Sequence, residues 1–387
     1  MVSIGELVGQ SYSYYPLPLK LLQCYVTGIQ LFDSGDEKVG DAKTGDVKTV
    51  KIIDLRSDTV TRPTETMRQV MFEAEVGDDV YAEDPTVNRL QELAAEMAGM
   101  EAGLFVPSGT QGNLLAILSH CQRGEEYIAG QQAHCYRYEA GGAAVFGGVQ
   151  PQPISFEEDG TLDLSQVAAV IKPDDDHFAI TRLLCLENTQ AGKVLPLDYQ
   201  SDAADFAREC GLKLHLDGAR VFNAAVWQQV SLSAITRHYD SASFCLSKGL
   251  GAPVGAILVG SRAFIDRAHR WRKMAGGGMR QAGILAAAGI YAIEHHVERL
   301  AEDHLHATML AEGLARIDGL DVDLDAVQTN MVFVSMDPDE QSRLIGFLKT
   351  RGILVGGYGQ LRLVTHHDIE AEDIPFVIET FQAAMAS

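Results

Sequence analysis

The chain has 387 residues, 46% hydrophobic and 22% charged, which is typical of a globular protein long enough for two domains. Its net charge of −22 argues against nucleic acid and anionic membrane surfaces as partners, because both select for basic patches. No apolar stretch reaches the roughly eighteen residues of a membrane span, and the six scattered cysteines indicate reduced thiols. We therefore expect a soluble, cytoplasmic protein that acts on small molecules.

The first residues differ from the rest. A polar stretch from Ser34 to Lys48 follows a segment with several tyrosines and prolines. The absence of arginine and the presence of several acids argue against a mitochondrial presequence. We interpret residues 1–51 as an N-terminal extension, either disordered or the product of a wrongly assigned start codon.

From Ile52 onward, helical and strand patterns alternate. The spacing of apolar residues predicts a helix over residues 86–100. Short apolar runs predict strands at residues 103–106, 183–186, 212–216, 243–246 and 255–259. Because helical stretches or loops separate most of these runs, the pattern predicts an α/β fold with three layers and a mostly parallel central sheet.

The character of the chain changes near residue 300. The pattern predicts a helix at about residues 298–317, strands at 330–334 and 361–364, and a closing helix at about 374–385. We interpret residues 52–298 as a large domain and residues 299–387 as a smaller C-terminal α+β domain. Residues 52–60 are expected to contact the small domain as well.

Polar residues follow several of the predicted strands. Ser108-Gly-Thr, Glu187-Asn-Thr, Asp217 and Lys248 each stand at the end of a different apolar run. In parallel α/β sheets the ligand lies outside the carboxyl ends of the strands. The sequence therefore predicts that these residues converge on one crevice.

Lys248 and Asp217 suggest a particular chemistry. A lysine at a strand terminus, followed by glycines and paired with an acid on a neighbouring strand, is suited to a Schiff base with pyridoxal 5'-phosphate (PLP), with the carboxylate on the pyridine nitrogen. On these two residues alone, a buried structural ion pair is an equally good interpretation. Gly109 and Thr110 likewise fit either a phosphate site at a helix N-terminus or a simple helix cap.

Several longer motifs resemble the low-specificity L-threonine aldolases, which belong to the fold-type I, PLP-dependent β-eliminating lyases. They are Asp54-Leu-Arg-Ser-Asp-Thr-Val-Thr-Arg-Pro63, Gly77-Asp-Asp-Val-Tyr81, Pro107-Ser-Gly-Thr-Gln111, Glu139-Ala-Gly-Gly142, His215-Leu-Asp-Gly-Ala-Arg220, Leu246-Ser-Lys-Gly-Leu-Gly251 and Trp271-Arg-Lys-Met-Ala-Gly-Gly-Gly-Met-Arg280. The resemblance covers the chain from about residue 52 to its end. The N-terminal extension has no counterpart in it.

The resemblance implies a PLP site built from residues far apart in the sequence. Lys248 would bind PLP covalently, Asp217 would hold the pyridine nitrogen protonated, and His134 would stack on the ring. Gly109 and Thr110 would bind the phosphate. Arg220 and Arg280 complete the implied cofactor site, Arg280 across a subunit contact.

The substrate carboxylate would bind Ser57, Arg220 and Arg362, each charge-assisted hydrogen bond contributing about 1.5–3 kcal/mol. One position departs from the family pattern, because Gln190 stands where these enzymes commonly have a histidine that meets the β-hydroxyl. An amide cannot take that proton near neutral pH, so His134 or a bound water would have to do so. We expect activity with an altered preference at Cβ.

The resemblance thus implies cleavage of L-threonine, L-allo-threonine and related β-hydroxy-α-amino acids to glycine and an aldehyde by a PLP-dependent aldehyde-lyase. Other PLP reactions remain open, namely β-elimination, racemisation and transamination, as does a PLP-binding protein without turnover. The family is expected to form a homotetramer. No metal site is predicted, since the adjacent histidines at 295–296 and 366–367 do not have a ligand spacing that selects one.

Overall fold

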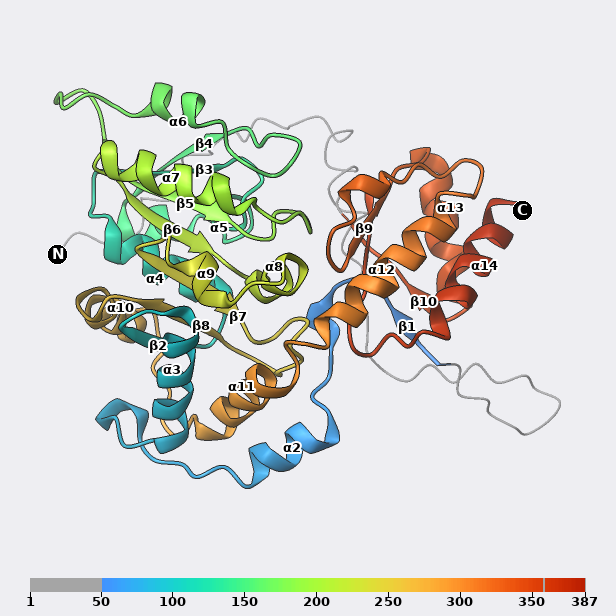
Figure 1. Ribbon diagram of the computed structural model, residues 1–387, viewed down its shortest axis with the longest axis horizontal. Helices are drawn as coiled ribbons and strands as arrows, with labels where there is room; N and C mark the ends of the chain where they lie inside the picture. The colour runs from blue at the N-terminus through green and yellow to red at the C-terminus, as the bar shows by residue number, and fades with distance from the viewer. Residues whose placement is uncertain (1–50, 358, 387) are drawn as a thin grey trace, which may run out of the picture. The chain divides into compact units, whose positions relative to one another are not determined.

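The computed structural model describes residues 51–357 and 359–386, and Figure 1 shows its helices and strands. The predicted N-terminal extension therefore lies outside the described residues, except for Lys51. The α-helices are α2 (Glu65–Phe72), α3 (Pro85–Ala98), α4 (Gly109–His120), α5 (His134–Arg137), α6 (Leu164–Val170), α7 (Leu197–Glu209), α8 (Val221–Gln228), α9 (Leu232–Thr236), α10 (Arg262–Met274), α11 (Gly283–His295), α12 (Leu300–Leu314), α13 (Pro338–Thr350) and α14 (Asp373–Met385).

The strands are β1 (Ile53–Asp54), β2 (Ala102–Val106), β3 (Glu125–Gly130), β4 (Gln150–Ile154), β5 (Ile180–Glu187), β6 (Lys213–Asp217), β7 (Ser241–Cys245), β8 (Ala256–Gly260), β9 (Met331–Val334), β10 (Ile353–Leu354) and β11 (Leu361–Val364). Short helical turns occur at η1 (Asp58–Val60), η2 (Asp79–Tyr81), η3 (Ala143–Gly147) and η4 (Leu324–Ala326).

Seven strands form the central sheet, in the order β2-β8-β7-β6-β5-β3-β4. The strands from β7 to β4 run parallel, and β8 is antiparallel to both of its neighbours. The prediction of a mostly parallel sheet is confirmed. It places the carboxyl ends of β5, β6 and β7 side by side at one edge.

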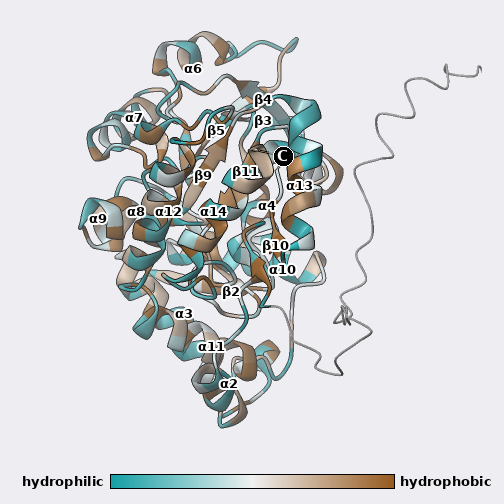
Figure 2. Ribbon diagram, turned by 90° about the vertical axis from the view of Figure 1, so that its right-hand side faces the viewer, coloured by the Kyte–Doolittle hydropathy of each residue, from teal (hydrophilic) through white to brown (hydrophobic). Residues whose placement is uncertain are grey.

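Helices cover both faces of this sheet, because alternate residues of its strands point to opposite sides. On β5, Leu184 and Leu186 join a core cluster with residues of α3, α7, α8, α9 and α11. Leu183 and Cys185 between them face a second cluster that includes Ile117 of α4. In Figure 2 the sheet strands are mostly hydrophobic, whereas helices such as α7 and α13 carry both kinds of residue. The predicted three-layer arrangement is confirmed.

Local signals set the helix ends. The Asp84 carboxylate accepts hydrogen bonds from the first N–H groups of α3, and Gly99 ends this helix with a φ of 63°. The helix predicted over residues 86–100 is thus confirmed, and it stops earlier because glycine adopts the left-handed conformation at low cost. No helix in the described part of the chain combines the length and apolarity needed to cross a bilayer.

The C-terminal elements have a hydrophobic cluster of their own, built from α12, α13, α14 and the strands β9, β10 and β11. Ile53 and Leu55 belong to the same cluster, and Ile53 pairs with Ile353 of β10 in parallel register. Asn330, which precedes β9, donates a hydrogen bond to Asp58. The domain boundary between residues 298 and 299 stays a prediction.

A buried ion pair joins α10 to the turn η2. Arg272 Nη2 lies 2.7 Å from Asp79 Oδ2, and its Nη1 donates to the Phe105 carbonyl of β2 at 2.8 Å. Both side chains are buried. An Arg272→Gln substitution would leave the Asp79 carboxylate buried without its partner.

We expect Arg272→Gln to lower the free energy of unfolding by about 3 kcal/mol, the usual cost of breaking a buried pair. Urea unfolding at constant protein concentration would measure it. Arg270→Gln is the matched control, because Arg270 is an exposed arginine on the same helix. Equal losses for the two variants would contradict the assignment.

Candidate active site

The carboxyl edge of the central sheet brings together polar side chains from three strands. Glu187 ends β5 and pairs in register with Asp217, the last residue of β6, which pairs in turn with Ser243 of β7. Lys248 follows β7 in a bend. The convergence predicted at this edge is present for these residues.

Asp217 is the buried anion of the site and is 3% exposed. Its Oδ2 accepts a hydrogen bond of 2.6 Å from Nδ2 of Asn113, and its Oδ1 accepts one of 3.2 Å from the Ala219 backbone. Both donors are uncharged. A cationic N–H group brought to this carboxylate would therefore gain a strong, charge-assisted hydrogen bond.

His134, at the start of α5, lies beside this carboxylate. Its Nδ1 is 2.8 Å from Oε1 of Glu139, and its backbone N–H donates to Oε2 of Glu187 at 2.7 Å. The hydrogen bond to Glu139 raises the pKa of His134, and the charge of Asp217 adds to this effect. Because a carboxylate only accepts, we assign the Nδ1–H tautomer, in which Nε2 is an acceptor.

Glu187 is buried deeply enough to titrate near neutrality. Its burial, and then the negative charge of Asp217, raise its pKa to about 7, against the opposing effects of His134 and Lys248. The carboxyl of Glu139 is also buried, and this raises its pKa. The site thus contains carboxyl groups whose charge states depend on one another.

The charge of Lys248 acts on the carboxylates of Glu187 and Asp58, where it lowers the pKa of each. The Lys248 carbonyl oxygen accepts hydrogen bonds from the Gly251 backbone at 2.8 Å and from the Thr61 hydroxyl at 3.1 Å. These two bonds fix the bend that presents the amine to the site.

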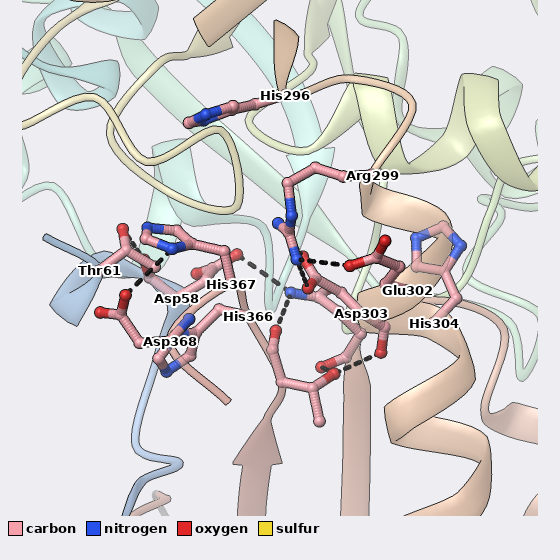
Figure 3. A network of polar contacts seen from close by, with 12 residues as sticks. Asp58, Thr61, His296, Arg299, Glu302, Asp303, His304, His366, His367 and Asp368 are labelled. Atoms are coloured by element: carbon pink, nitrogen blue, oxygen red, sulfur yellow. Dashed lines mark hydrogen bonds and ion pairs between the residues drawn. The ribbon is translucent and has the colours of Figure 1, made fainter. Parts of the chain in front are cut away.

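Figure 3 shows a polar network that gathers residues of three segments, Asp58 and Thr61, His296 to His304, and His366 to Asp368. Two of these segments contact the loop after Lys248. His296 Nδ1 lies 2.7 Å from the Leu250 carbonyl oxygen. Gly251 has a φ of 77°, and a side chain there would begin 3.0 Å from Nε2 of His367. The loop is therefore held by residues of two distant segments, which restricts where Lys248 can lie.

Arg220 is held by a buried carboxylate. Its Nε and Nη2 lie 2.7 and 2.5 Å from the two oxygens of Asp58, to which Asn330 also donates. Burial by itself would raise the pKa of Asp58, but the Arg220 guanidinium and then Lys248 hold it at about 2. Arg220 is thereby fixed, and Asp58 engages the Nε and Nη2 side of its guanidinium.

Ser57 and Arg362 lie in adjoining segments. The Ser57 hydroxyl accepts a hydrogen bond of 3.2 Å from the Thr59 backbone at the start of η1. Nη2 of Arg362, on β11, donates to the Arg56 carbonyl at 3.1 Å. Ser57 therefore lies one residue from a direct contact of Arg362, and Asp58, which binds Arg220, follows Ser57.

Gly109 and Thr110 open α4, where the first backbone N–H groups have no partner within the helix. A side chain at Gly109 would begin 2.6 Å from Sγ of Cys245, so only glycine fits. Gly277 covers this helix end closely, since a side chain there would overlap the Gln111 amide. Among the described residues, Oε1 of Gln111 is buried without a hydrogen-bond partner. This cradle, Asp217 and Lys248 together fit a ligand with a phosphate, a protonated ring nitrogen and a carbonyl.

Two predicted site residues are not joined to this cluster by any contact described in residues 51–357 and 359–386. Gln190 exchanges backbone hydrogen bonds with Lys193 in a tight turn, and a side chain at Gly160 would begin 3.5 Å from its Oε1. Arg280 forms an ion pair of 2.9 Å with Asp78, and its side chain is 56% exposed. Their roles stay predictions.

Asn113, Glu139 and Asp58 are the residues that the sequence analysis did not single out as site residues. Asn113 is the polar residue in an apolar stretch of α4, which is a signal that could have been noticed. Ligand atoms of His134, Glu139 and Asp217 also lie within 4.8 Å of one another, a spacing that a cation would accept. The hydrogen bonds from Asn113 and His134 already engage both carboxylates, and the prediction of no metal stays a prediction.

Comparisons with known proteins agree with the family resemblance found in the sequence. A family model described as β-eliminating lyase matches residues 54–337. The chain is 56% identical over 335 residues to the low specificity L-threonine aldolase of Escherichia coli K12, covering 87% of this chain and 100% of that protein. It is 46% identical over 349 residues to low-specificity L-threonine aldolase 1 of Arabidopsis thaliana, covering 87% and 97%.

Solved structures share the fold. The threonine aldolase of Leishmania major superposes with a TM-score of 0.74 at 21% identity, covering 86% of this chain and 99% of that one. A serine palmitoyltransferase of Sphingomonas wittichii gives 0.69 at 17% identity, covering 94% and 95%. The predicted fold-type I architecture is confirmed.

The raised pKa of Glu187 predicts a pH-dependent cost to stability. As the pH rises above about 4.5, the unfolded chain ionises this group while the folded protein keeps it protonated until about pH 7. Without PLP, the free energy of unfolding of Glu187→Gln relative to that of the parent should therefore increase by on the order of 2–3 kcal/mol as the pH rises from 5 to 8. Urea unfolding at both pH values measures this gain, with the exposed Glu158→Gln as the control. A difference that stays constant with pH would contradict the prediction.

Proposed function

This chain belongs to the β-eliminating lyase family and, within it, to the low-specificity L-threonine aldolases, and we propose that it cleaves L-threonine and L-allo-threonine to glycine and acetaldehyde. Related β-hydroxy-α-amino acids would give the corresponding aldehydes. The proposal rests on one observation, the meeting of Asp217, His134 and Lys248 at the carboxyl edge of the sheet. Members of this family are PLP-dependent lyases, and the residues present fit that cofactor.

Five residues near the carboxyl edge of the sheet would hold the cofactor, and Arg220 and Arg280 would complete its site. Lys248 would bind it covalently, and Asp217 would accept a hydrogen bond from its pyridine nitrogen. Gly109 and Thr110 would donate backbone N–H groups to its phosphate, and His134 would lie against its ring. PLP held in this way supplies an electron sink for the substrate Cα.

Ser57, Arg220 and Arg362 would bind the substrate carboxylate. Because Asp58 takes the Nε side of the Arg220 guanidinium, the carboxylate would meet the Nη1 side. A carboxylate held by several groups fixes which Cα bond lies in line for cleavage, and here that bond would be Cα–Cβ. This orientation would favour aldol cleavage over the other reactions that PLP permits.

The β-hydroxyl proton needs an acceptor, and the amide of Gln190 cannot serve near neutral pH. His134 is the candidate that the geometry supports, because Glu139 engages its Nδ1 and leaves Nε2 to accept a proton directly or through a water. Glu139 would also stabilise the imidazolium that forms.

We further propose that the protein is a homotetramer of the cytoplasm, acting in threonine catabolism and glycine biosynthesis. Large apolar side chains on neighbouring segments support an assembly, since Phe72, Tyr81 and Met274 are 85, 70 and 66% exposed. The backbone hydrogen bond from Asp79 to Arg280 brings these segments together. Arg280 lies on this surface, where it would reach the cofactor of a neighbouring subunit.

Acetaldehyde release tests the function directly. The PLP-loaded protein should release acetaldehyde from L-threonine and from L-allo-threonine, and Lys248→Ala should lower both rates by at least about 10³-fold. Lys213→Ala, at the opposite end of the neighbouring strand, is the control and should retain the parent rates. Bound PLP without release from either substrate would overturn the proposal in favour of a bulkier β-hydroxy-amino acid, β-elimination, racemisation or transamination.

Gln190 is expected to set the preference at Cβ. Gln190→His would add a proton acceptor beside the β-hydroxyl, so the ratio of the L-threonine and L-allo-threonine rates should change by at least about threefold. The two rates measured in parallel give the ratio, with Gln166→His on the exposed face of α6 as the control. An unchanged ratio would remove Gln190 from the substrate site.

A further inference from the structure

A buried amide lies between the two carboxylates of the proposed cofactor site. Asn113, on α4, is 1% exposed. Its Nδ2 donates to Oε1 of Glu139 at 2.9 Å and to Oδ2 of Asp217 at 2.6 Å. An amide nitrogen carries two hydrogens, so one is available for each carboxylate.

The surroundings of Asn113 fix which way its amide points. Its Oδ1 accepts a hydrogen bond of 2.7 Å from the Ser243 hydroxyl and lies 3.3 Å from Nε2 of His215. The reverse orientation would place the amide oxygen against two carboxylates, with no hydrogen between them. Both ends of the amide are therefore satisfied in one orientation only.

The network continues away from the site through two neutral histidines. Nδ1 of His215 and Nε2 of His120 each lie 2.8 Å from the Ser241 hydroxyl. Burial lowers the pKa of each imidazole to about 3, so each ring has one donor and one acceptor nitrogen. One assignment satisfies every atom: His120 donates to Ser241, Ser241 to His215, and His215 to Asn113.

We propose that Asn113 is a positioning residue, which holds Asp217 as an anion facing the cofactor nitrogen and links it through Glu139 to His134. This inference rests on the proposed PLP site. Asn113 touches neither PLP nor substrate in this role, since its side chain is engaged by Asp217, Glu139 and Ser243.

Removal of the amide has a definite electrostatic consequence. Asp217 raises the pKa of both Glu139 and Glu187, and the hydrogen bond from the Asn113 amide opposes this effect at Glu139. Two carboxylates that face each other without a donor between them favour protonation of one. Without the Asn113 hydrogen bond, the Asp217 carboxylate would also lose the donor that fixes its orientation toward the pyridine nitrogen, so PLP affinity would fall.

The competing explanation is that Asn113 is only a buried core amide. Both explanations predict a loss of stability on substitution, so stability alone does not separate them. They differ in the effect on PLP itself, because only the positioning role alters how Asp217 meets the cofactor.

The test compares Asn113→Leu with Gln200→Met. Gln200, on α7, is also a fully buried amide. It donates a hydrogen bond to the Leu195 carbonyl and accepts one from the Tyr239 hydroxyl. PLP-free protein would be titrated with PLP and followed by absorbance, with urea unfolding in parallel. We expect both variants to lose stability, and only Asn113→Leu to bind PLP about 10- to 100-fold more weakly.

Two further readouts separate positioning from damage to the fold. The pH at which the absorbance of bound PLP changes should shift in Asn113→Leu and not in Gln200→Met. In turnover, kcat should fall while the KM for L-threonine changes less than about twofold, because Asn113 does not contact the substrate. Parent-like PLP affinity and absorbance in a folded Asn113→Leu protein would overturn the proposal.

If Asn113→Leu fails to fold, the Ser243→Ala variant tests the same proposal. It removes the hydroxyl that orients the amide without touching either carboxylate, and it should weaken PLP binding by about threefold with the same direction of spectral shift. Unchanged PLP affinity and absorbance would again overturn the proposal. A parent protein that binds PLP but releases no acetaldehyde would refute the aldolase activity, while the PLP affinities would still decide the role of Asn113.

Discussion

The burial of negative charge at the carboxyl edge of the sheet is the constraint on which the rest of the site depends. Asp217, Glu187 and Glu139 are brought together by strand register and by a short helix, and the side chains of Asp217 and Glu139 are buried. Charges in such surroundings persist only when donors or cations accompany them. Donors and cations accompany the charges here, namely the Asn113 amide, the backbone of Ala219, the imidazole of His134 and the amine of Lys248. The proposed catalytic groups therefore also compensate the buried negative charge.

The Asp58–Arg220 pair applies the same constraint at the opposite side of the site. It connects the first described segment to the start of α8, and Asn330 adds the C-terminal elements to the same carboxylate. A cation intended for a substrate must be held without being neutralised completely, and a single bidentate partner on one side of the guanidinium does this. The clamp is thereby preorganised before any substrate arrives.

Much of this could be predicted from the sequence, because the signals were local. Strand-terminal Asp217 and Lys248 were visible as polar residues after apolar runs, and parallel topology put them at one edge. Asn113 was not singled out, since its partners Asp217 and Glu139 lie 104 and 26 residues away along the chain and no short motif encodes such separations. Side-chain direction was equally hidden at Gln190, whose turn carries its amide to Gly160. Helix ends differed from expectation where a glycine stopped the helix, as Gly99 does.

The pairing of β1 with β10 has a consequence for biosynthesis. Ile53 leaves the ribosome long before Ile353, its partner in the register, so the nascent chain must carry the first strand unpaired until β10 has been made. Asp58 lies a few residues beyond that strand, and its contact with Asn330 likewise waits until the segment before β9 has been made. Such long-range closure is slow because its entropy is lost before any contact is gained. The amino-terminal part of the carboxylate clamp can therefore be completed only after these C-terminal elements have been synthesised.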